Sequence, residues 1–196
     1  MAILPVIKYG HPTLRKKAKA VHPAELAESF IQDMVETMEA LDGVGLAANQ
    51  VNVPKQLLVA RDVDHKKLHI LINPEIVADS EKKESDIEGC LSLPGLQAEV
   101  PRFFKIIVKA QTPAGEEIEI TARGHFARVL QHEIDHLNGI LYIDRANADT
   151  LVWIIEDGRK EYSTKNATLP DIQHQYTSRY HTGLQGIRFE AETEIA

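Results

Sequence analysis

With 196 residues, of which 43% are hydrophobic and 26% charged, the chain is long enough for one compact domain with a hydrophobic core. The formal net charge of −7 argues against a protein that binds DNA or RNA through clustered basic residues, so we expect no nucleic-acid partner. The sequence lacks both an apolar run of bilayer-spanning length and a recognisable secretion signal, which predicts a cytoplasmic protein without a membrane partner.

The first half of the chain begins with an extended stretch, residues 3–9, and continues into an amphipathic helix predicted from Ala24 to Asp42. Its apolar residues recur every three or four positions and form one core-facing stripe. The members of this stripe are Leu26, Phe30, Met34, Met38 and Leu41. Short apolar runs then predict strands at Leu57–Arg61 and Leu68–Ile72.

In the second half, two alternating runs, Phe104–Ala110 and Glu116–Thr121, flank a Thr-Pro-Ala-Gly turn and predict a β-hairpin. A second helix is predicted from Gly124 to Asn138, and Gly139 follows it as a stop signal. Strands around two helices, without regular alternation of strand and helix, predict an α+β fold with mainly antiparallel sheets.

The second helix contains His132-Glu133-Ile134-Asp135-His136, an H-E-x-x-H pattern. Helical residues four apart lie on one face, so both imidazoles can bind one metal ion. Glu133, one position further round the helix, can then handle the protons of a water molecule without binding the metal. The pattern alone is also compatible with two surface histidines or two packed core histidines.

The only cysteine, Cys90, excludes an intramolecular disulfide and lies in Glu88–Gly95, a segment that its glycines and proline predict to be a loop. A lone intracellular cysteine is usually a small buried hydrophobe. One thiolate and two imidazoles, however, make a site with three protein ligands and a fourth position open to water. That arrangement is typical of catalytic metal sites.

A third segment, Gly43-Val44-Gly45-Leu46-Ala47-Ala48-Asn49-Gln50, is rich in small residues. A helix stop followed by a tight loop would explain it. Small residues also let a ligand approach the backbone closely, and Gln50 offers a side-chain N–H.

Taken together, the three segments resemble the signature motifs of the peptide deformylases, which read G-x-G-L-A-A-x-Q, E-G-C-L-S and Q-H-E-x-D-H-L. The matching stretches are Gly43 to Gln50, Glu88 to Ser92 and Gln131 to Leu137, in the order and spacing of the family. The resemblance covers residues 3–145 and implies the deformylase α+β fold, with the H-E-x-x-H helix central among antiparallel strands.

The resemblance also implies catalytic roles for the matching residues. The metal ligands would be Cys90, His132 and His136. Glu133 would act as general base and then as general acid, while the Gln50 amide and the backbone N–H of Leu91 would stabilise the oxyanion.

Substrate-binding roles follow in the same way. Gly45 would present its backbone to the substrate peptide. The methionine side chain would enter a pocket formed by Val44, Val129 and neighbouring apolar side chains, beside Leu91.

The activity implied by the resemblance is hydrolysis of the N-formyl group from formyl-methionine at the N-terminus of newly synthesised polypeptides, with release of formate. One divalent ion per chain is implied, ferrous iron in the cell, and zinc, nickel or cobalt also suit a thiolate with two imidazoles. The implied partners are N-formylmethionyl nascent chains, and a transient association with the ribosome is a further expectation.

We expect residues 1–145 to form the catalytic domain and residues 146–196 to form a C-terminal extension of uncertain structure. Many members of the family close with a helix. Here Lys160–Ala196 shows no convincing helical pattern and is expected to be extended or partly ordered.

Outside the predicted ligands, Glu88 and Arg102 are candidates to pair and brace the Cys90 segment. Asp135 is expected either to orient a ligating imidazole or to face solvent. The remaining histidines, among them His125, are interpreted as surface or packing residues.

Two other functions fit parts of the sequence. A zinc endopeptidase also uses H-E-x-x-H, but it would need a third ligand downstream of the helix, whereas Cys90 lies upstream. A non-catalytic binding module would usually have lost Glu133 or a ligand, and all of these residues are present.

Overall fold

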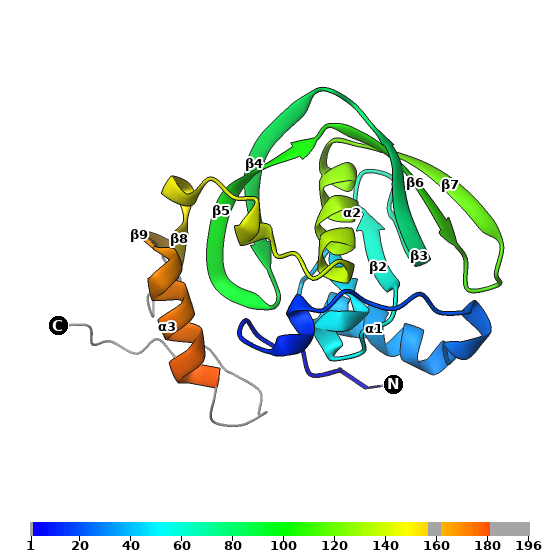
Figure 1. The fold of residues 1–196 in the computed structure, drawn as a ribbon, viewed down its shortest axis with the longest axis horizontal. Helices are drawn as coiled ribbons and strands as arrows, with labels where there is room; N and C mark the ends of the chain where they lie inside the picture. The colour runs from blue at the N-terminus through cyan, green and yellow to red at the C-terminus, as the bar shows by residue number, and fades with distance from the viewer. Residues whose placement is uncertain (1, 157–161, 181–196) are drawn as a thin grey trace.

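The computed structural model of the chain describes residues 2–156 and 162–180. Its strands form two antiparallel sheets, which curve around a central helix (Figure 1). The five-stranded sheet has the order β1 (Gly45–Ala47), β2 (Leu57–Asp62), β3 (Lys67–Asp79), β6 (Lys105–Gln111) and β7 (Glu117–Arg123). The four-stranded sheet has the order β4 (Lys83–Cys90), β5 (Leu93–Phe103), β8 (Val152–Glu156) and β9 (Tyr162–Asn166).

Three α-helices accompany the sheets: α1 (Glu28–Ala40), α2 (Gly124–Leu137) and α3 (Leu169–Tyr180). Helix α2 lies between the two sheets, α1 lies below it, and α3 lies beside β8 at the far side of the molecule (Figure 1). The predicted α+β class, with antiparallel sheets and the H-E-x-x-H helix at the centre, is confirmed. No helix in these described ranges is long and apolar enough to cross a membrane.

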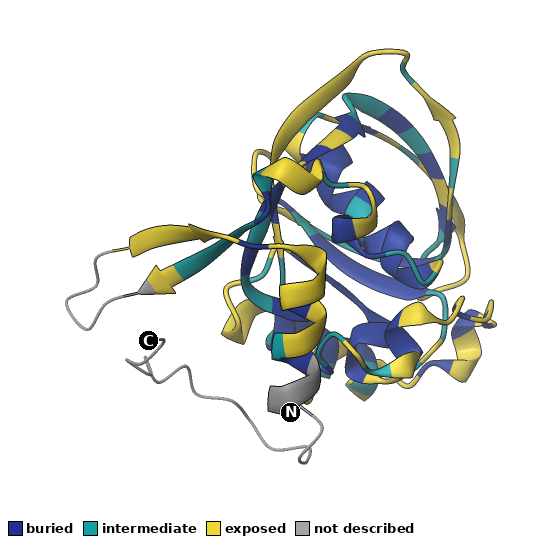
Figure 2. Cartoon of the chain, turned by 60° about the vertical axis from the view of Figure 1, so that its left-hand side comes forward, coloured by how far each residue is buried: buried dark blue, intermediate teal, exposed yellow. Residues whose placement is uncertain are grey.

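Helix α2 is buried along most of its length (Figure 2). Its apolar residues pack on one face of the five-stranded sheet; this core includes Phe126, Leu130, Ile134, Leu58, Leu71, Ile106 and Val108. Because both sheets cover α2, most of its polar residues are buried too, and each buried one needs a partner inside the protein. The position of α2 therefore decides which polar groups meet in the interior.

The first predicted helix is shorter than expected. A short 3₁₀ turn, Pro23–Glu25, precedes α1, which begins only at Glu28. Met34 and Met38 are fully buried in the core under β1 and β2, which confirms their predicted packing role. Leu41 follows the end of α1 and is 41% exposed, so its assignment to the core stripe is wrong.

The prediction of a loop over Glu88–Gly95 is wrong, because these residues belong to the β4–β5 hairpin. Glu88 pairs with Ala98, Gly89 with Gln97, and Cys90 closes the hairpin opposite Leu93. The glycines and the proline obscured the alternation that defines the strands. Gly95 nevertheless needs its small size, since its φ of 75° is a conformation that side chains disfavour.

The C-terminal extension is more ordered than predicted. The expectation that Lys160–Ala196 has no helix is wrong for residues 169–180, and residues 181–196 lie outside the described ranges. Among residues 169–176 of α3, whose burial the structure describes, Ile172 and Tyr176 are buried in the core beneath β5, one turn apart on the same face. The boundary between residues 145 and 146 stays a prediction.

Candidate metal centre

The three predicted metal ligands meet at one point between α2 and the β4–β5 hairpin. The donor atoms of Cys90, His132 and His136 all lie within 4.8 Å of one another. The Cys90 Sγ atom is 3.2 Å from Nε2 of His136, and the two imidazole rings have centroids 4.9 Å apart. The four-residue spacing on α2 places both rings on one face, as the sequence predicted.

The cysteine reaches this point because it ends β4. A register shift between Gly89 and Cys90 brings Cys90 opposite Leu93 at the tight end of the hairpin. The backbone N–H of Ser92 then donates a hydrogen bond to Sγ at 3.4 Å. The hairpin thus presents the sulfur toward α2 instead of leaving it in a flexible loop.

His132 is oriented by a carboxylate that the sequence analysis assigned to another role. Its Nδ1 atom lies 2.9 Å from Oε2 of Glu88, which leaves Nε2 as the nitrogen available to bind a metal. Burial would raise the pKa of Glu88, but hydrogen bonds from His132 and Arg102 lower it to about 2. A charged carboxylate therefore fixes this ring.

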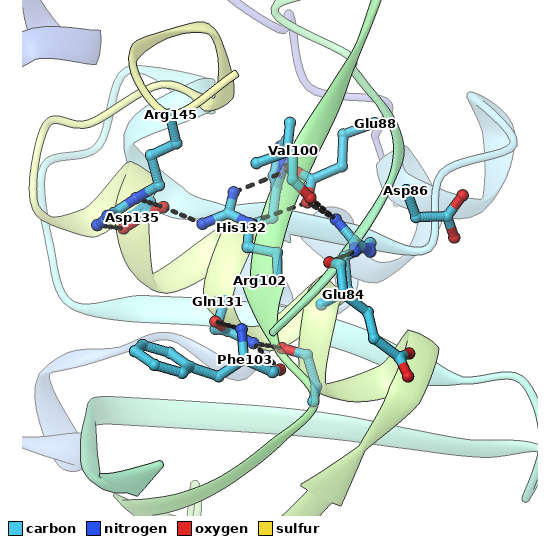
Figure 3. Close-up of polar contacts among 12 residues, drawn as sticks. Glu84, Asp86, Glu88, Val100, Arg102, Phe103, Gln131, His132, Asp135 and Arg145 are labelled. Carbon is cyan, nitrogen blue, oxygen red and sulfur yellow. Dashed lines mark hydrogen bonds and ion pairs between the residues drawn. The ribbon is translucent and has the colours of Figure 1, made fainter. Parts of the chain in front are cut away.

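Glu88 belongs to a buried network of ion pairs between β4, β5 and α2 (Figure 3). Arg102 donates two hydrogen bonds of 2.9 Å to its carboxylate, which confirms the predicted pair. Arg128 adds a bond of 2.8 Å from α2 to the same group. Arg102 also contacts Asp135 of α2, so one guanidinium joins the hairpin to the helix.

Both expectations for Asp135 are wrong. Its side chain is buried and binds no imidazole; it accepts hydrogen bonds from Arg102 and from Arg145, the latter at 2.6 and 2.7 Å. The carboxylate that orients a ligating histidine is Glu88. The sequence carried no clear signal of this role, because the glycines and the proline near Glu88 predicted a loop and a register shift separates Gly89 from Cys90.

Glu133 lies beside the ligands and is 4% exposed. Burial raises its pKa to about 7, against the lowering effect of His132, and its Oε2 atom has no hydrogen-bond partner in the described part of the chain. Gly45 makes room for it, since a Cβ atom there would lie 2.8 Å from both Cγ and Cδ of Glu133. Gly45 therefore has a steric reason to be glycine that the sequence analysis did not foresee.

The orientation of Gln50 is fixed by its own loop. Its Oε1 atom accepts the backbone N–H of Ala47 at 2.8 Å. The Nε2 atom therefore points to the centre, 3.2 Å from Oγ of Ser92 and 3.6 Å from Sγ of Cys90. A buried N–H donor beside the ligand atoms is what the predicted oxyanion role requires.

A cavity of about 1170 Å³ opens at this centre. Of the predicted site residues, those at its wall are Val44, Gly45, Gln50, Cys90, Leu91, Val129, His132 and Glu133. His136 is 1% exposed and lies behind them. The cavity is also lined by residues outside the predicted site, among them Lys8, which donates a 2.8 Å hydrogen bond to the Leu91 carbonyl, and the exposed His125.

The donor set fits a divalent transition metal. Burial lowers the pKa of His136 well below its usual range, so this imidazole is neutral, as a ligand must be. Burial acts in the same direction on His132, but hydrogen bonds to Cys90 and Glu88 raise the pKa of that ring well above its usual range. The surroundings of His132 thus favour positive charge, which a metal ion would provide.

Comparison with known proteins gives a consistent family match. The model of the family described as "Polypeptide deformylase" matches residues 3–151. A peptide deformylase of Natranaerobius thermophilus is 46% identical over 147 residues, which cover 74% of this chain and 94% of that protein. A peptide deformylase of Halothermothrix orenii is 48% identical over 148 residues, covering 74% of this chain and 94% of that protein. The crystal structure of peptide deformylase from Thermotoga maritima superposes with a TM-score of 0.72 at 41% identity, covering 75% of this chain and 99% of that one.

Proposed function

We propose a role for each residue around the metal site, starting from the family of the chain. The chain belongs to the polypeptide deformylase family and is thus a metal-dependent hydrolase that removes the N-formyl group from nascent peptides. Cys90, His132 and His136 hold the metal. Glu133 moves the proton, while Gln50 and Leu91 stabilise the oxyanion. The observation that carries this proposal is the meeting of the three ligand atoms within 4.8 Å beside the buried Glu133.

A divalent ion held by these ligands would supply Lewis acidity and would lower the pKa of a water molecule toward neutrality. The carboxylate of Glu133 accepts the proton of a water molecule as the water oxygen attacks the formyl carbon. The raised pKa of about 7 suits a group that must first accept and later donate a proton. Glu133 then delivers the proton to the leaving amine, which releases formate and a free N-terminus.

The negative charge that develops on the formyl oxygen needs hydrogen-bond donors at the wall of the cavity. The Nε2 group of Gln50 is held toward the centre by the bond between Oε1 and Ala47, so it needs no reorientation during the reaction. The backbone N–H of Leu91 is the second donor. The hydrogen bond from Lys8 to the Leu91 carbonyl supports it by restraining the adjacent Leu91–Ser92 peptide unit.

The methionine side chain of the substrate enters the apolar part of the cavity. Val129 of α2 is 5% exposed and forms its inner wall, whereas Val44 is 37% exposed and lies nearer solvent. Leu91 lies at the same wall. Gly45, next to Glu133, presents its backbone to the substrate peptide.

The metal in the cell is proposed to be ferrous iron. A thiolate with two imidazoles also suits zinc, nickel and cobalt, so metal analysis of anaerobically purified protein has to identify the ion. The substrates are N-formylmethionyl nascent chains, with transient association at the ribosome and a cytoplasmic location as further parts of the proposal.

Anaerobic turnover of formyl-Met-Ala-Ser by the purified chain and by Glu133→Ala, with bound metal quantified in both, tests the proposal. Formate release that disappears in the variant while the metal is retained would support the role of Glu133. Formate release by metal-loaded Glu133→Ala at the rate of the parent chain would refute it. A metal-loaded parent chain that releases no formate would favour a non-catalytic binding module.

A further inference from the structure

The segment that follows the family match completes one wall of the cavity. The family model ends at residue 151, immediately before β8. Strand β8 pairs with β5, Leu96 opposite Trp153 and Gln97 opposite Val152, so the β4–β5 sheet continues into the extension. Two residues of the extension, Ile154 and Tyr176, line the same cavity as the metal ligands.

Tyr176 holds this wall in position. Its ring is 2% exposed and lies edge-on to Tyr9 with centroids 5.6 Å apart. Its hydroxyl donates a 2.8 Å hydrogen bond to the carbonyl of Pro94, three residues beyond Leu91. Helix α3 is thereby attached to the hairpin that carries Cys90.

Strand alternation decides which side chains β8 presents on each face of the sheet. Trp153 lies opposite Leu96 and packs with it in the core, so its neighbours Val152 and Ile154 point to the other face. Gln97 shares this outer face with Gly89, its partner on β4, and Ile87 is two residues away on the same strand. Ile87, Gly89, Gln97 and Ile154 all line the cavity.

At the cavity wall this outer face presents two isoleucines, Ile87 and Ile154, beside the polar Gln97. Ile87 is 61% exposed, although it lies at the cavity wall, and Gly89 offers no side chain. The cavity, at about 1170 Å³, exceeds the ~300–1,000 Å³ typical of small-molecule sites, so a single formyl-methionine residue leaves part of it free.

We propose that the outer face of β4, β5 and β8 binds the peptide that follows formyl-methionine, with Ile154 contacting an apolar side chain of that peptide. The proposal rests on the deformylase function proposed above. Neighbouring strands are about 4.8 Å apart, so β8 lies roughly 10 Å from β4, and an extended peptide advances about 3.3 Å per residue. The contact thus falls on the third or fourth residue of the substrate, and the extension sets a sequence preference there.

The test compares formyl-Met-Ala-Ser-Ser with two peptides that carry leucine at the third or the fourth position. The full chain is assayed with Ile154→Thr and with the matched control Ile155→Thr. Threonine keeps the β-branched shape that suits a strand. Ile155 is the adjacent residue of β8; it is 45% exposed and lies away from the cavity, so it controls for an effect on the strand itself.

The parent chain is expected to favour one of the leucine peptides about tenfold in kcat/KM, mainly through KM, because one apolar contact of this size discriminates by about that factor. Ile154→Thr should abolish most of this preference, and Ile155→Thr should retain it. A parent chain without a leucine preference would overturn the proposal, as would an Ile154→Thr variant that keeps it, or equal loss in both variants. Absence of formate from every peptide would instead show that the proposed function has failed, and this inference with it.

Discussion

Substituting Gly45 with alanine should displace the proposed catalytic carboxylate without touching a metal ligand. The added Cβ would lie 2.8 Å from Cγ and Cδ of Glu133, whereas carbon atoms pack at about 3.5–4.0 Å. Glu133 must therefore retreat by about 1 Å, and a displacement of this size typically costs about a hundredfold in rate. We expect kcat of Gly45→Ala to fall about a hundredfold, because the proton acceptor leaves its position.

The assay is formate release from formyl-Met-Ala-Ser under anaerobic conditions, with metal content measured on the same preparations. Gly115→Ala is the control: Gly115 lies in the turn between β6 and β7, outside the cavity, and a Cβ there would meet nothing within 4 Å. Its kcat should stay within a few-fold of that of the parent chain. A Gly45→Ala variant with normal kcat, or one whose loss of activity follows loss of metal, would refute this steric reasoning.

Three further substitutions test the parts of the site separately. Gln50→Ala removes a proposed oxyanion donor and should lower kcat about a hundredfold to a thousandfold in the formate assay; near-normal turnover would exclude that role. Arg102→Met leaves the buried carboxylates of Glu88 and Asp135 without one of their cations and should lower the free energy of unfolding, measured by urea titration, by about 3 kcal/mol. Arg61→Met removes a more exposed ion pair and should lower it by at most about 1 kcal/mol. Equal losses in these two variants would contradict the importance of the buried network. Glu88→Gln keeps an acceptor for His132 but removes its charge, so metal affinity in a chelator competition should weaken about 10- to 100-fold, and unchanged affinity would contradict the orienting role.

The sequence was sufficient for those parts of the site that depend on local periodicity. The spacing of His132 and His136 predicted two ligands on one helix face, and the alternation around Thr112–Gly115 predicted the β6–β7 hairpin. Both patterns are short-range, since four residues make one helical turn and two make one strand repeat. Cys90 was identified as a ligand from its residue type and its motif, although its strand was predicted to be a loop.

The rest depended on contacts between segments far apart in the chain. No local pattern showed that Asp135 would pair with Arg102 and Arg145. These pairs form only when α2 packs against β5, which carries Arg102, and against the turn after α2, which carries Arg145. Helix α3 was missed because, among its residues 169–176, Ile172 and Tyr176 are the ones in the core, too few to produce a periodic apolar pattern. The tertiary contacts of these two residues hold a helix whose own sequence is mostly polar.

The buried ion pairs also fix the position of α2 along its own axis. A slip of this helix by one turn, about 5.4 Å along its axis, would separate Arg128 from Glu88 and Asp135 from Arg102 in the same movement. Apolar contacts alone would resist such a slip weakly, because they have little directionality, whereas each unpaired buried charge costs several kcal/mol. The position of His132 and His136 relative to Cys90 is therefore fixed by ion pairs within the protein. The three ligands are aligned before a metal ion binds.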